Sequence, residues 1–131
     1  MIGLVLFVLQ APLAIVRLEA TAAVPTWAWS GELCSVTRTI DELSIVCTET
    51  SVPPDVLAER GWRALKVQGP LDFSLTGVLA ALAAPLAAAA IPIFALSTYQ
   101  TDYVLVHVRD LTRASEALTK AGHTVGQPDG H

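Results

Sequence analysis

Basic residues are scarce in this sequence, and nowhere do they gather. Lysine and arginine number eight against twelve acidic residues, which gives a formal net charge of −4 at pH 7. Without a basic run, the chain has nothing that could neutralise a row of phosphates. The charge balance therefore argues against a nucleic-acid partner.

Cysteine is also rare. Cys34 and Cys47 are too few for a disulfide scaffold. Both lie on predicted strands, and a hairpin centred between Ile40 and Asp41 would place them opposite each other. Two interpretations stay open: the cysteines form a redox-active pair, or they are two buried reduced thiols. The second is favoured if the protein is cytosolic, because thiols are kept reduced there.

The motifs of familiar enzymes are missing as well. Ser44 and Ser97 lack the glycine frame of a nucleophile elbow, neither cysteine has a local activating motif, and no phosphate loop or dinucleotide fingerprint occurs. Asp41 and Glu42 could form a carboxylate pair, but they fall on a predicted turn and should face solvent. We predict that the protein is not an enzyme.

Charge is absent altogether between Asp72 and Asp102, and most of that stretch is apolar. Hydropathy alone makes residues 78–96 a membrane span, but Pro85 and Pro92 leave no uninterrupted stretch long enough to cross a bilayer. The flanking basic residues show no positive-inside asymmetry. No basic residue precedes the apolar N-terminal segment, as a secretory signal would require. We expect a cytoplasmic protein that does not span a membrane.

Apolar residues are abundant and make up 53% of the 131 residues. A chain of this length and composition can form one compact domain or two small units that share a core. The first half reads as strands rich in β-branched residues, over residues 4–8, 13–18, 33–39 and 43–48. Pro53 and Pro54 end this part. We expect one short helix over residues 55–60, closed by Gly61.

The second half alternates strands and helices. The pattern predicts strands over residues 62–67, 91–96, 103–108 and 123–125. A helix capped by Ser74 or Thr76 follows the first strand and contains Pro85. A second helix is capped by Asp110 and closed by Gly122, with Leu111, Ala114, Leu118 and Ala121 as its apolar stripe.

The resulting order is strand, helix, strand, strand, helix, strand. That order is the ferredoxin-like βαββαβ plan of the α+β class. We expect two such units side by side: a degenerate one over residues 1–60, in which a strand pair replaces the first helix, and a full one over residues 61–126. Residues 127–131 should form a frayed tail.

Several segments resemble a known family. They are Thr39-Ile-Asp-Glu-Leu-Ser-Ile-Val-Cys47, Gly61-Trp-Arg-Ala-Leu-Lys-Val67, Gly69-Pro-Leu-Asp-Phe73, Gly77-Val-Leu79 and Ile93-Phe-Ala-Leu-Ser-Thr-Tyr-Gln-Thr-Asp-Tyr103. In order and spacing, they resemble the small bacterial proteins built from paired ACT domains, which are similar to the ACT units of the cytosolic arginine sensors of animals. The resemblance runs from about residue 4 to residue 125 and identifies no particular ligand.

The resemblance implies a regulatory module that binds an amino acid or related metabolite where two ACT units meet. The ligand contacts it implies fall on the turn before a helix, on a Ser-Thr-aromatic turn, and on a strand of the other unit. They are Gly69, Leu71, Asp72 and Phe73; then Ser97, Thr98, Tyr99 and Asp102; then Ser44 and Ile45.

The chemistry of these positions suits a free amino acid. The N-terminus of the helix after Phe73 would attract a carboxylate, and Asp72 or Asp102 could hold an ammonium through a charge-assisted hydrogen bond. Each residue also has a structural interpretation. Asp72 can cap a helix, Asp102 can stabilise a tight turn, and Ser44 can face solvent.

We therefore expect a non-catalytic amino-acid sensor. A homodimer is expected as well, because residues 87–90 are four alanines where an exposed helix face would usually carry charge. Neither a metal nor another cofactor is expected, since no second ligand lies at metal spacing from His107 or His123. The alternative is a structural interaction module whose pocket is vestigial.

Overall fold

The computed structural model describes residues 3–71 and 76–127. The chain forms two compact units. Met1–Gln10 and Arg63–His131 make up one, called here the helical unit, and Ala11–Trp62 make up the other, called the strand unit. The first strand of the chain is thus grouped with the C-terminal elements. β5 (Ala58–Val67) contributes its first half to the strand unit and its second half to the helical unit.

The strand unit is an antiparallel sheet in the order β3, β4, β2, β5. Its strands besides β5 are β2 (Leu13–Leu18), β3 (Ser35–Arg38) and β4 (Leu43–Thr48), and its two 3₁₀ turns are Thr26–Trp29 and Glu49–Ser51. Alternation along the strands sends one set of side chains into a common core. The fully buried or nearly buried members of that core are Ala14, Val16, Ala28, Leu43, Ile45, Cys47 and Val52.

The predicted hairpin between residues 33 and 48 is confirmed. Ser35 pairs with Val46 and Arg38 with Leu43, so its centre lies between residues 40 and 41. The Thr39 N–H donates to the Glu42 carbonyl at 2.9 Å and closes a two-residue turn. The register of this hairpin was therefore readable from the sequence.

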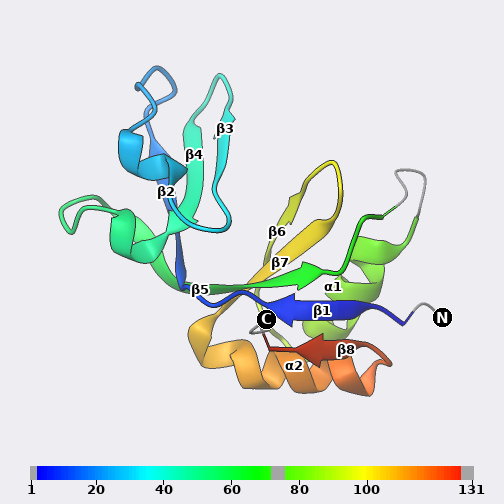
Figure 1. Cartoon of the computed structure of the whole chain (residues 1–131). Coiled ribbons are helices and arrows are strands. Elements are labelled where there is room, and N and C mark those ends of the chain that lie inside the picture. The colour runs from blue at the N-terminus through cyan, green and yellow to red at the C-terminus, as the bar shows by residue number, and fades with distance from the viewer. Residues whose placement is uncertain (1–2, 72–75, 128–131) are drawn as a thin grey trace. The chain divides into compact units, whose positions relative to one another are not determined.

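The helical unit has the order of elements that the sequence predicts, with β5, α1, β6, β7, α2 and β8 following one another (Figure 1). Their bounds are α1 Val78–Ala88, β6 Phe94–Ser97, β7 Asp102–His107, α2 Leu111–Lys120 and β8 Thr124–Gly126, with a 3₁₀ turn at Val108–Asp110 before α2. This is the ferredoxin-like βαββαβ plan of an α+β protein. The predicted fold class is confirmed.

The sheet of this unit runs β6, β7, β5, β1, β8. The additional strand is β1 (Val5–Val8), which lies between β5 and β8, antiparallel to the former and parallel to the latter. Both α-helices pack on one face of the sheet. The buried residues at that face come from strands and helices alike: Leu6, Val8, Leu65, Val67, Val104, Val106, Leu82, Leu86, Ala114 and Leu118.

His123 is buried beneath this layer and is 4% exposed. Its Nδ1 accepts a hydrogen bond from the Leu4 N–H at 3.1 Å, and its Nε2 lies 3.1 Å from the Ala81 carbonyl oxygen. One imidazole thus joins the start of β1, α1 and the segment before β8. These contacts give His123 a structural role in the helical unit.

The short helix predicted over residues 55–60 is wrong. The chain makes a turn in which the Val56 N–H donates to the Pro53 carbonyl at 3.1 Å, and β5 begins at Ala58. Pairing with β2 overrides the local preference of these residues. Gly61 closes no helix; it has φ of 78° within β5, and its N–H donates to the Glu49 carboxylate at 2.6 Å.

The caps also differ from expectation. The N-cap of α1 is Gly77, one residue after Thr76, and Ser74 lies outside the described residues. Asp110 does occupy the N-cap of α2, but its carboxylate accepts a hydrogen bond from the Arg113 guanidinium at 3.0 Å instead of capping a backbone N–H.

None of the helices within residues 3–71 and 76–127 is long and apolar enough to cross a membrane.

Candidate functional site

Two segments far apart in the sequence meet in the helical unit. The loop after β5 and the turn between β6 and β7 are joined where the Leu71 N–H donates to the Gln100 carbonyl at 2.7 Å. Thr101, only 4% exposed, donates its hydroxyl to the Val67 carbonyl, also at 2.7 Å. A Cβ at Gly69 would stand 3.1 Å from the Gln100 carbonyl oxygen. The two turns are therefore in direct contact, and the approach is close enough to favour glycine.

The β6–β7 turn is itself tightly ordered. The Thr98 N–H donates to the Thr101 carbonyl at 2.8 Å, and the Thr98 hydroxyl donates to the same oxygen at 3.1 Å. Ser97 and Asp102 form the last register pair of the ladder, and the Ser97 hydroxyl donates to the Asp102 carboxylate at 2.6 Å. Polar groups at the mouth of the turn are thus held in fixed orientations by hydrogen bonds within the turn.

Asp102 keeps acceptor capacity in this arrangement. A carboxylate offers about four lone-pair positions, and the bond from Ser97 uses one of them. The side chain is partly exposed, and the neighbouring Tyr99 is 82% exposed. A partly exposed carboxylate can accept a hydrogen bond from an ammonium or guanidinium group without losing its whole hydration shell.

The residues implied by the resemblance divide into three sets. The structure brings one set together in the helical unit, at the two turns: Gly69, Leu71, Ser97, Thr98, Tyr99 and Asp102. Asp72 and Phe73 lie outside the described residues. Ser44 and Ile45 belong to the strand unit, where both lie on β4.

Ile45 and Ser44 sit in the middle of the strand unit's sheet. Ile45 is 0% exposed and packs in the core, and its backbone pairs with both Val16 and Val36. Ser44 is the next residue along the strand, so it faces the other side of the sheet and is half-buried. Of the two, only Ser44 offers a side-chain polar group.

Sequence reasoning missed Thr101 and Gln100, which make the contact between the turns. Both fall in the segment 97–103 that carries the resemblance, so its position was signalled. In the sequence, a threonine whose hydroxyl donates to a distant carbonyl looks the same as one that faces solvent. The role of Thr101 becomes visible only when the fold brings Val67 next to it.

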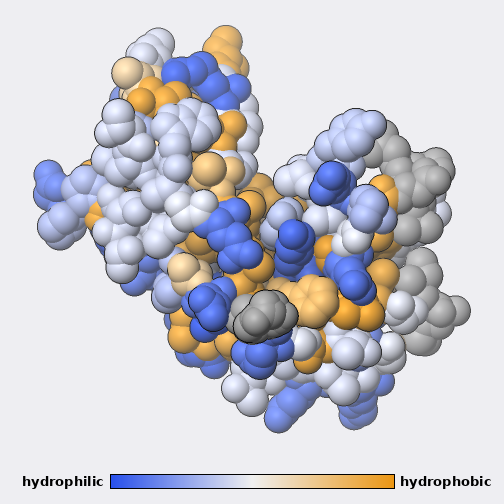
Figure 2. Space-filling model, in the orientation of Figure 1, coloured by the Kyte–Doolittle hydropathy of each residue, from blue (hydrophilic) through white to orange (hydrophobic). Residues whose placement is uncertain are grey.

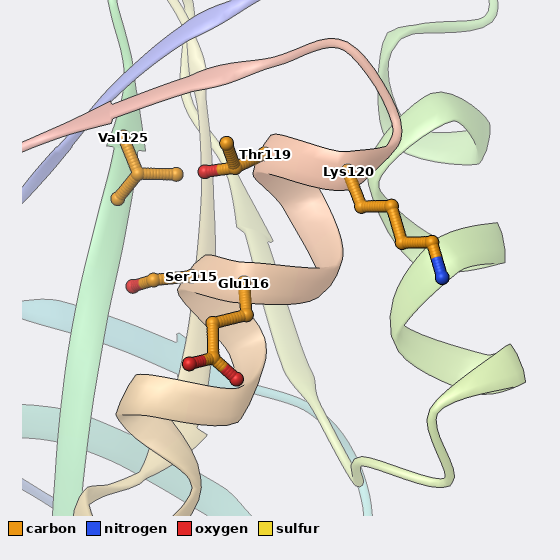
Figure 3. Close-up of a pocket in the computed structure, with 5 residues that line it drawn as sticks. All are labelled: Ser115, Glu116, Thr119, Lys120 and Val125. Atoms are coloured by element: carbon orange, nitrogen blue, oxygen red, sulfur yellow. The ribbon is translucent and has the colours of Figure 1, made fainter.

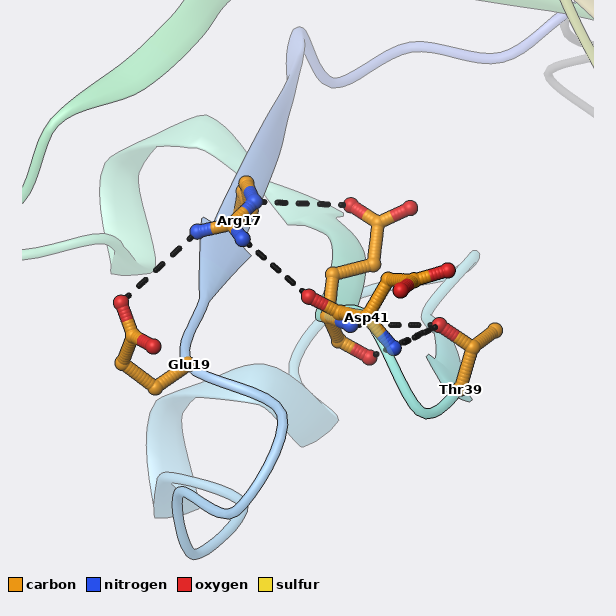
Figure 4. Close-up of polar contacts among 5 residues, drawn as sticks. Arg17, Glu19, Thr39 and Asp41 are labelled. Carbon is orange, nitrogen blue, oxygen red and sulfur yellow. Dashed lines mark hydrogen bonds and ion pairs between the residues drawn. The ribbon is translucent and has the colours of Figure 1, made fainter.

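The remaining carboxylate pair of the sequence is structural. Asp41 and Glu42 lie on the β3–β4 turn, where both backbone N–H groups donate to the Thr39 hydroxyl at 3.1 and 3.2 Å (Figure 4). Arg17 lies 3.9 Å from the Glu42 carboxylate and donates to the Asp41 carbonyl at 3.1 Å. As predicted, Asp41 is exposed; Glu42 is partly buried beside an arginine. These contacts stabilise a turn.

A pocket of about 370 Å³ opens along α2 (Figure 3). Its lining consists of Ser115, Glu116, Thr119, Lys120 and Val125. Thr119 and Val125 point toward a common space, whereas the Lys120 side chain points away from it. Glu116 and Lys120 are exposed and one helical turn apart, a spacing typical of a solvated helix face. Among the described residues, none of those implied by the resemblance lines this pocket.

Large apolar side chains reach the surface at isolated places. The most exposed are Ile40, Leu57, Tyr99 and Trp29, three of which belong to turns or loops of the strand unit. On the face shown in Figure 2, apolar side chains lie between polar ones. Single exposed apolar residues are ordinary on protein surfaces and identify no site by themselves.

Comparison with known families identifies one domain of this chain. Residues 57–120 match the model of the ACT domain, and residues 12–55 match a separate family of N-terminal domains. The chain therefore contains an ACT domain, which belongs to a class of regulatory domains, and that domain extends from β5 to the end of α2.

One similarity, to a bacterial protein, extends over the whole chain. The chain is 39% identical to protein Atu0741 of Agobacterium tumefaciens, with a TM-score of 0.93, over 100% of this chain and 98% of that one. It belongs to the same family as Atu0741.

Two further similarities are partial. The human protein CASTOR3P is 35% identical in a match 98 positions long, which covers 65% of this chain and 60% of that relative's length. The aspartate kinase of Clostridium acetobutylicum is 11% identical with a TM-score of 0.62, over 86% of this chain and 33% of the kinase. At that identity the kinase shares the fold alone.

Proposed function

We propose that this protein is a non-catalytic regulatory module that binds an amino acid or a related small metabolite at the two joined turns of the helical unit. The observation that supports this most directly is the hydrogen bond between Leu71 and Gln100. It holds the loop of Gly69 against the turn of Ser97 and Asp102, which are the positions that the resemblance to arginine sensors assigns to the ligand.

The chemistry of an amino acid fits the groups present. Asp102 would accept from the α-ammonium or from a basic side chain, with Ser97 fixing the orientation of the carboxylate. The ligand's own carboxylate would be attracted to the N-terminus of α1, which begins at Val78 after the N-cap Gly77, because the first backbone N–H groups of a helix have no partner within the helix. Asp72 and Phe73 stay part of the proposal as flanking residues.

Ser44 and Ile45 hold a weaker place in it. Their ligand contacts are implied by the resemblance alone, and Ile45 is buried in the core with its backbone paired to strands on both sides. The mutational test below therefore uses the helical unit.

Thermal-shift measurements and titration calorimetry with the twenty standard amino acids would test this proposal. A ligand present at 100 times its Kd stabilises the folded state by about 2.7 kcal/mol, which raises Tm by several degrees. We expect such a rise for one or a few amino acids, and we expect Asp102→Asn to weaken binding of the same ligand by tenfold or more. Asp55→Asn, at an exposed loop position of the strand unit, is the matched control and should bind normally.

The alternative interpretation makes the opposite prediction. If no amino acid or related metabolite shifts Tm while the protein stays folded, the joined turns are structural, and the chain is an interaction module with a vestigial pocket. Equal loss of binding in Asp102→Asn and Asp55→Asn would show that the site lies elsewhere.

We also propose that the protein is a homodimer. The outward face of α1 carries Ala80, Ala84, Ala87 and Ala88, all exposed in the single chain and spaced for one helical face. An uncharged alanine face suits close packing against a second copy. Sedimentation velocity should give a dimer for the native sequence and a monomer for Ala84→Glu, while Thr112→Glu on the exposed side of α2 leaves the mass unchanged. A monomeric native protein would refute the dimer.

A further inference from the structure

Cys34 and Cys47 stand at matching positions of the β3–β4 hairpin. The last register pair on this side is Ser35 with Val46. One step outward along an antiparallel ladder, the next facing pair is Cys34 and Cys47. Both thiols are free in the structure. The sequence suggested this alignment, and the observed register now supports it.

Whether the two cysteines form a hydrogen-bonded or a non-hydrogen-bonded pair of the ladder determines how close their side chains lie, and so how readily a disulfide forms between them. Thr39 and Glu42 close the turn as a hydrogen-bonded pair, and hydrogen-bonded and non-hydrogen-bonded pairs alternate along an antiparallel ladder. Counting outward from that pair makes Cys34 and Cys47 a non-hydrogen-bonded pair. Such pairs have Cα atoms about 4.5 Å apart with their side chains close together, which falls within the 4.4–6.8 Å range of disulfides.

Both side chains also lie on the same face of the sheet. Cys47 is fully buried in the core of the strand unit, and Cys34 packs against that core while staying partly exposed. Burial is the main cause that raises the pKa of the Cys47 thiol, and the neighbouring Cys34 is the second. The register neighbour on the other side of Cys47 is the small residue Ala14.

We propose that Cys34 and Cys47 form a redox-active dithiol that a small-molecule disulfide converts to an intramolecular disulfide. The more accessible Cys34 thiolate attacks the oxidant, forming a mixed disulfide and releasing one thiolate. The Cys47 thiolate then attacks the Cys34 sulfur, forms the Cys34–Cys47 bond and releases the second thiolate. The two protein protons pass to the released thiolates, so the oxidant is reduced to two thiols.

This bond would act on the strand unit. It closes the loop of residues 35–46, which contains the β3–β4 turn and most of β4, and it reduces the freedom of the unfolded chain. The strand unit has only strands and short 3₁₀ turns to hold it, so one covalent link across its edge strand should have a measurable effect. The inference does not depend on the proposed ligand site.

Oxidised glutathione is the probe for the experiment. After incubation with the native protein, the intact mass should fall by two hydrogens, and a proteolytic digest should contain a peptide pair joined through Cys34 and Cys47. The Tm of the oxidised protein should exceed that of the reduced protein by roughly 5 to 10 °C. Dithiothreitol should reverse both changes.

Moving one cysteine by two residues into β3 tests whether the register that places Cys34 opposite Cys47 is needed for the disulfide. In the double variant Cys34→Ser, Val36→Cys, the new thiol faces Ile45 and lies diagonal to Cys47, at a Cα distance of about 7–8 Å that disfavours a disulfide. We expect its disulfide to form at least tenfold more slowly. A lasting glutathione adduct on Cys34, a disulfide between two chains, or an unmodified native protein would each overturn the proposal. So would equal rates for the native and shifted pairs.

Discussion

The helical unit and the strand unit are held together in different ways. The helical unit covers one sheet face with two helices, whose leucines Leu82, Leu86 and Leu118 are fully buried. Within Ala11–Trp62, which the structure describes without a gap, there is no α-helix. There, arginines tie the loops to one another: Arg38 donates to the carbonyls of Ala20 and Ala22.

The difference explains where the charges of the sequence fall. Apolar packing by α1 needs no charged partner, so the stretch between Asp72 and Asp102 can dispense with charge. The strand unit lacks a covering α-helix, and charge-assisted hydrogen bonds from arginines to backbone carbonyls order its loops. Arg63 and Arg113 make bonds of the same kind within the helical unit. In the helical unit, Asp102 has one described hydrogen bond, from Ser97.

Removing a buried leucine from α1 should have the largest effect on stability. Leu82→Ala deletes a fully buried side chain at the centre of the helical unit's core, and such changes cost about 2–5 kcal/mol. Urea unfolding should show this loss. Hydrogen exchange should rise most in α1 and α2. Leu57→Ala, at a position 92% exposed in the strand unit, should cost almost nothing. Equal losses would contradict the assigned core.

Thr101→Val tests the contact between the two turns. The variant keeps the shape of the side chain but removes the hydroxyl that donates to the Val67 carbonyl at 2.7 Å. A buried carbonyl left without that partner costs about 1–3 kcal/mol. The same substitution at the exposed Thr37 of β3 should be close to neutral. Unchanged stability of Thr101→Val would mean that the turns are held by backbone contacts alone.

Arg38→Ala probes the strand unit's polar links. Because this side chain is exposed, we expect a smaller loss, about 0.5–1.5 kcal/mol. Hydrogen exchange should increase in the 19–22 turn, while α1 and α2 keep their protection. Arg109→Ala, an exposed arginine before α2, serves as the charge-matched control. A loss above that of Leu82→Ala would reverse the comparison between the two units.

The sequence predicted well wherever a pattern is local. The hairpin register follows from a two-residue turn, and α2 follows from apolar residues three and four positions apart, with Gly122 ending it at φ of 101°. It predicted poorly wherever a distant partner decides the conformation. Residues 55–60 became a turn and the start of β5 because β2 pairs with them, which local propensity cannot reveal.

The candidate site shows the same division. The turn with Ser97 and Asp102 could be located from the sequence because its polar residues stand at the end of an uncharged stretch. Its contact with the loop of Leu71 could not, since that contact is a backbone hydrogen bond to Gln100 and any residue type can make it. The place of β1 between β5 and β8 is likewise a consequence of the whole sheet.

Cys47 offers the smallest and most specific test of the strand unit's core. Burial raises the pKa of its thiol in the folded state, so the folded thiol keeps its proton at pH values where the unfolded thiol, with a pKa near 8.5, loses it. The unfolded state then binds fewer protons, and the free energy of unfolding must fall as pH rises above about 8.5. Below that pH both states are protonated and the contribution is flat. Urea unfolding under reducing conditions from pH 7 to 10 should show this slope, at most about 1.4 kcal/mol per pH unit.

Cys47→Ala should remove that slope, whereas Cys34→Ala should reduce it only in part, because burial is the larger cause of the shift and Cys34 the smaller. An unaltered slope in Cys47→Ala would mean that the thiol is not buried in solution. The core of the strand unit would then be accessible to solvent on the side next to β3. The two units would differ in that the helical unit has a closed core and the strand unit an exposed one.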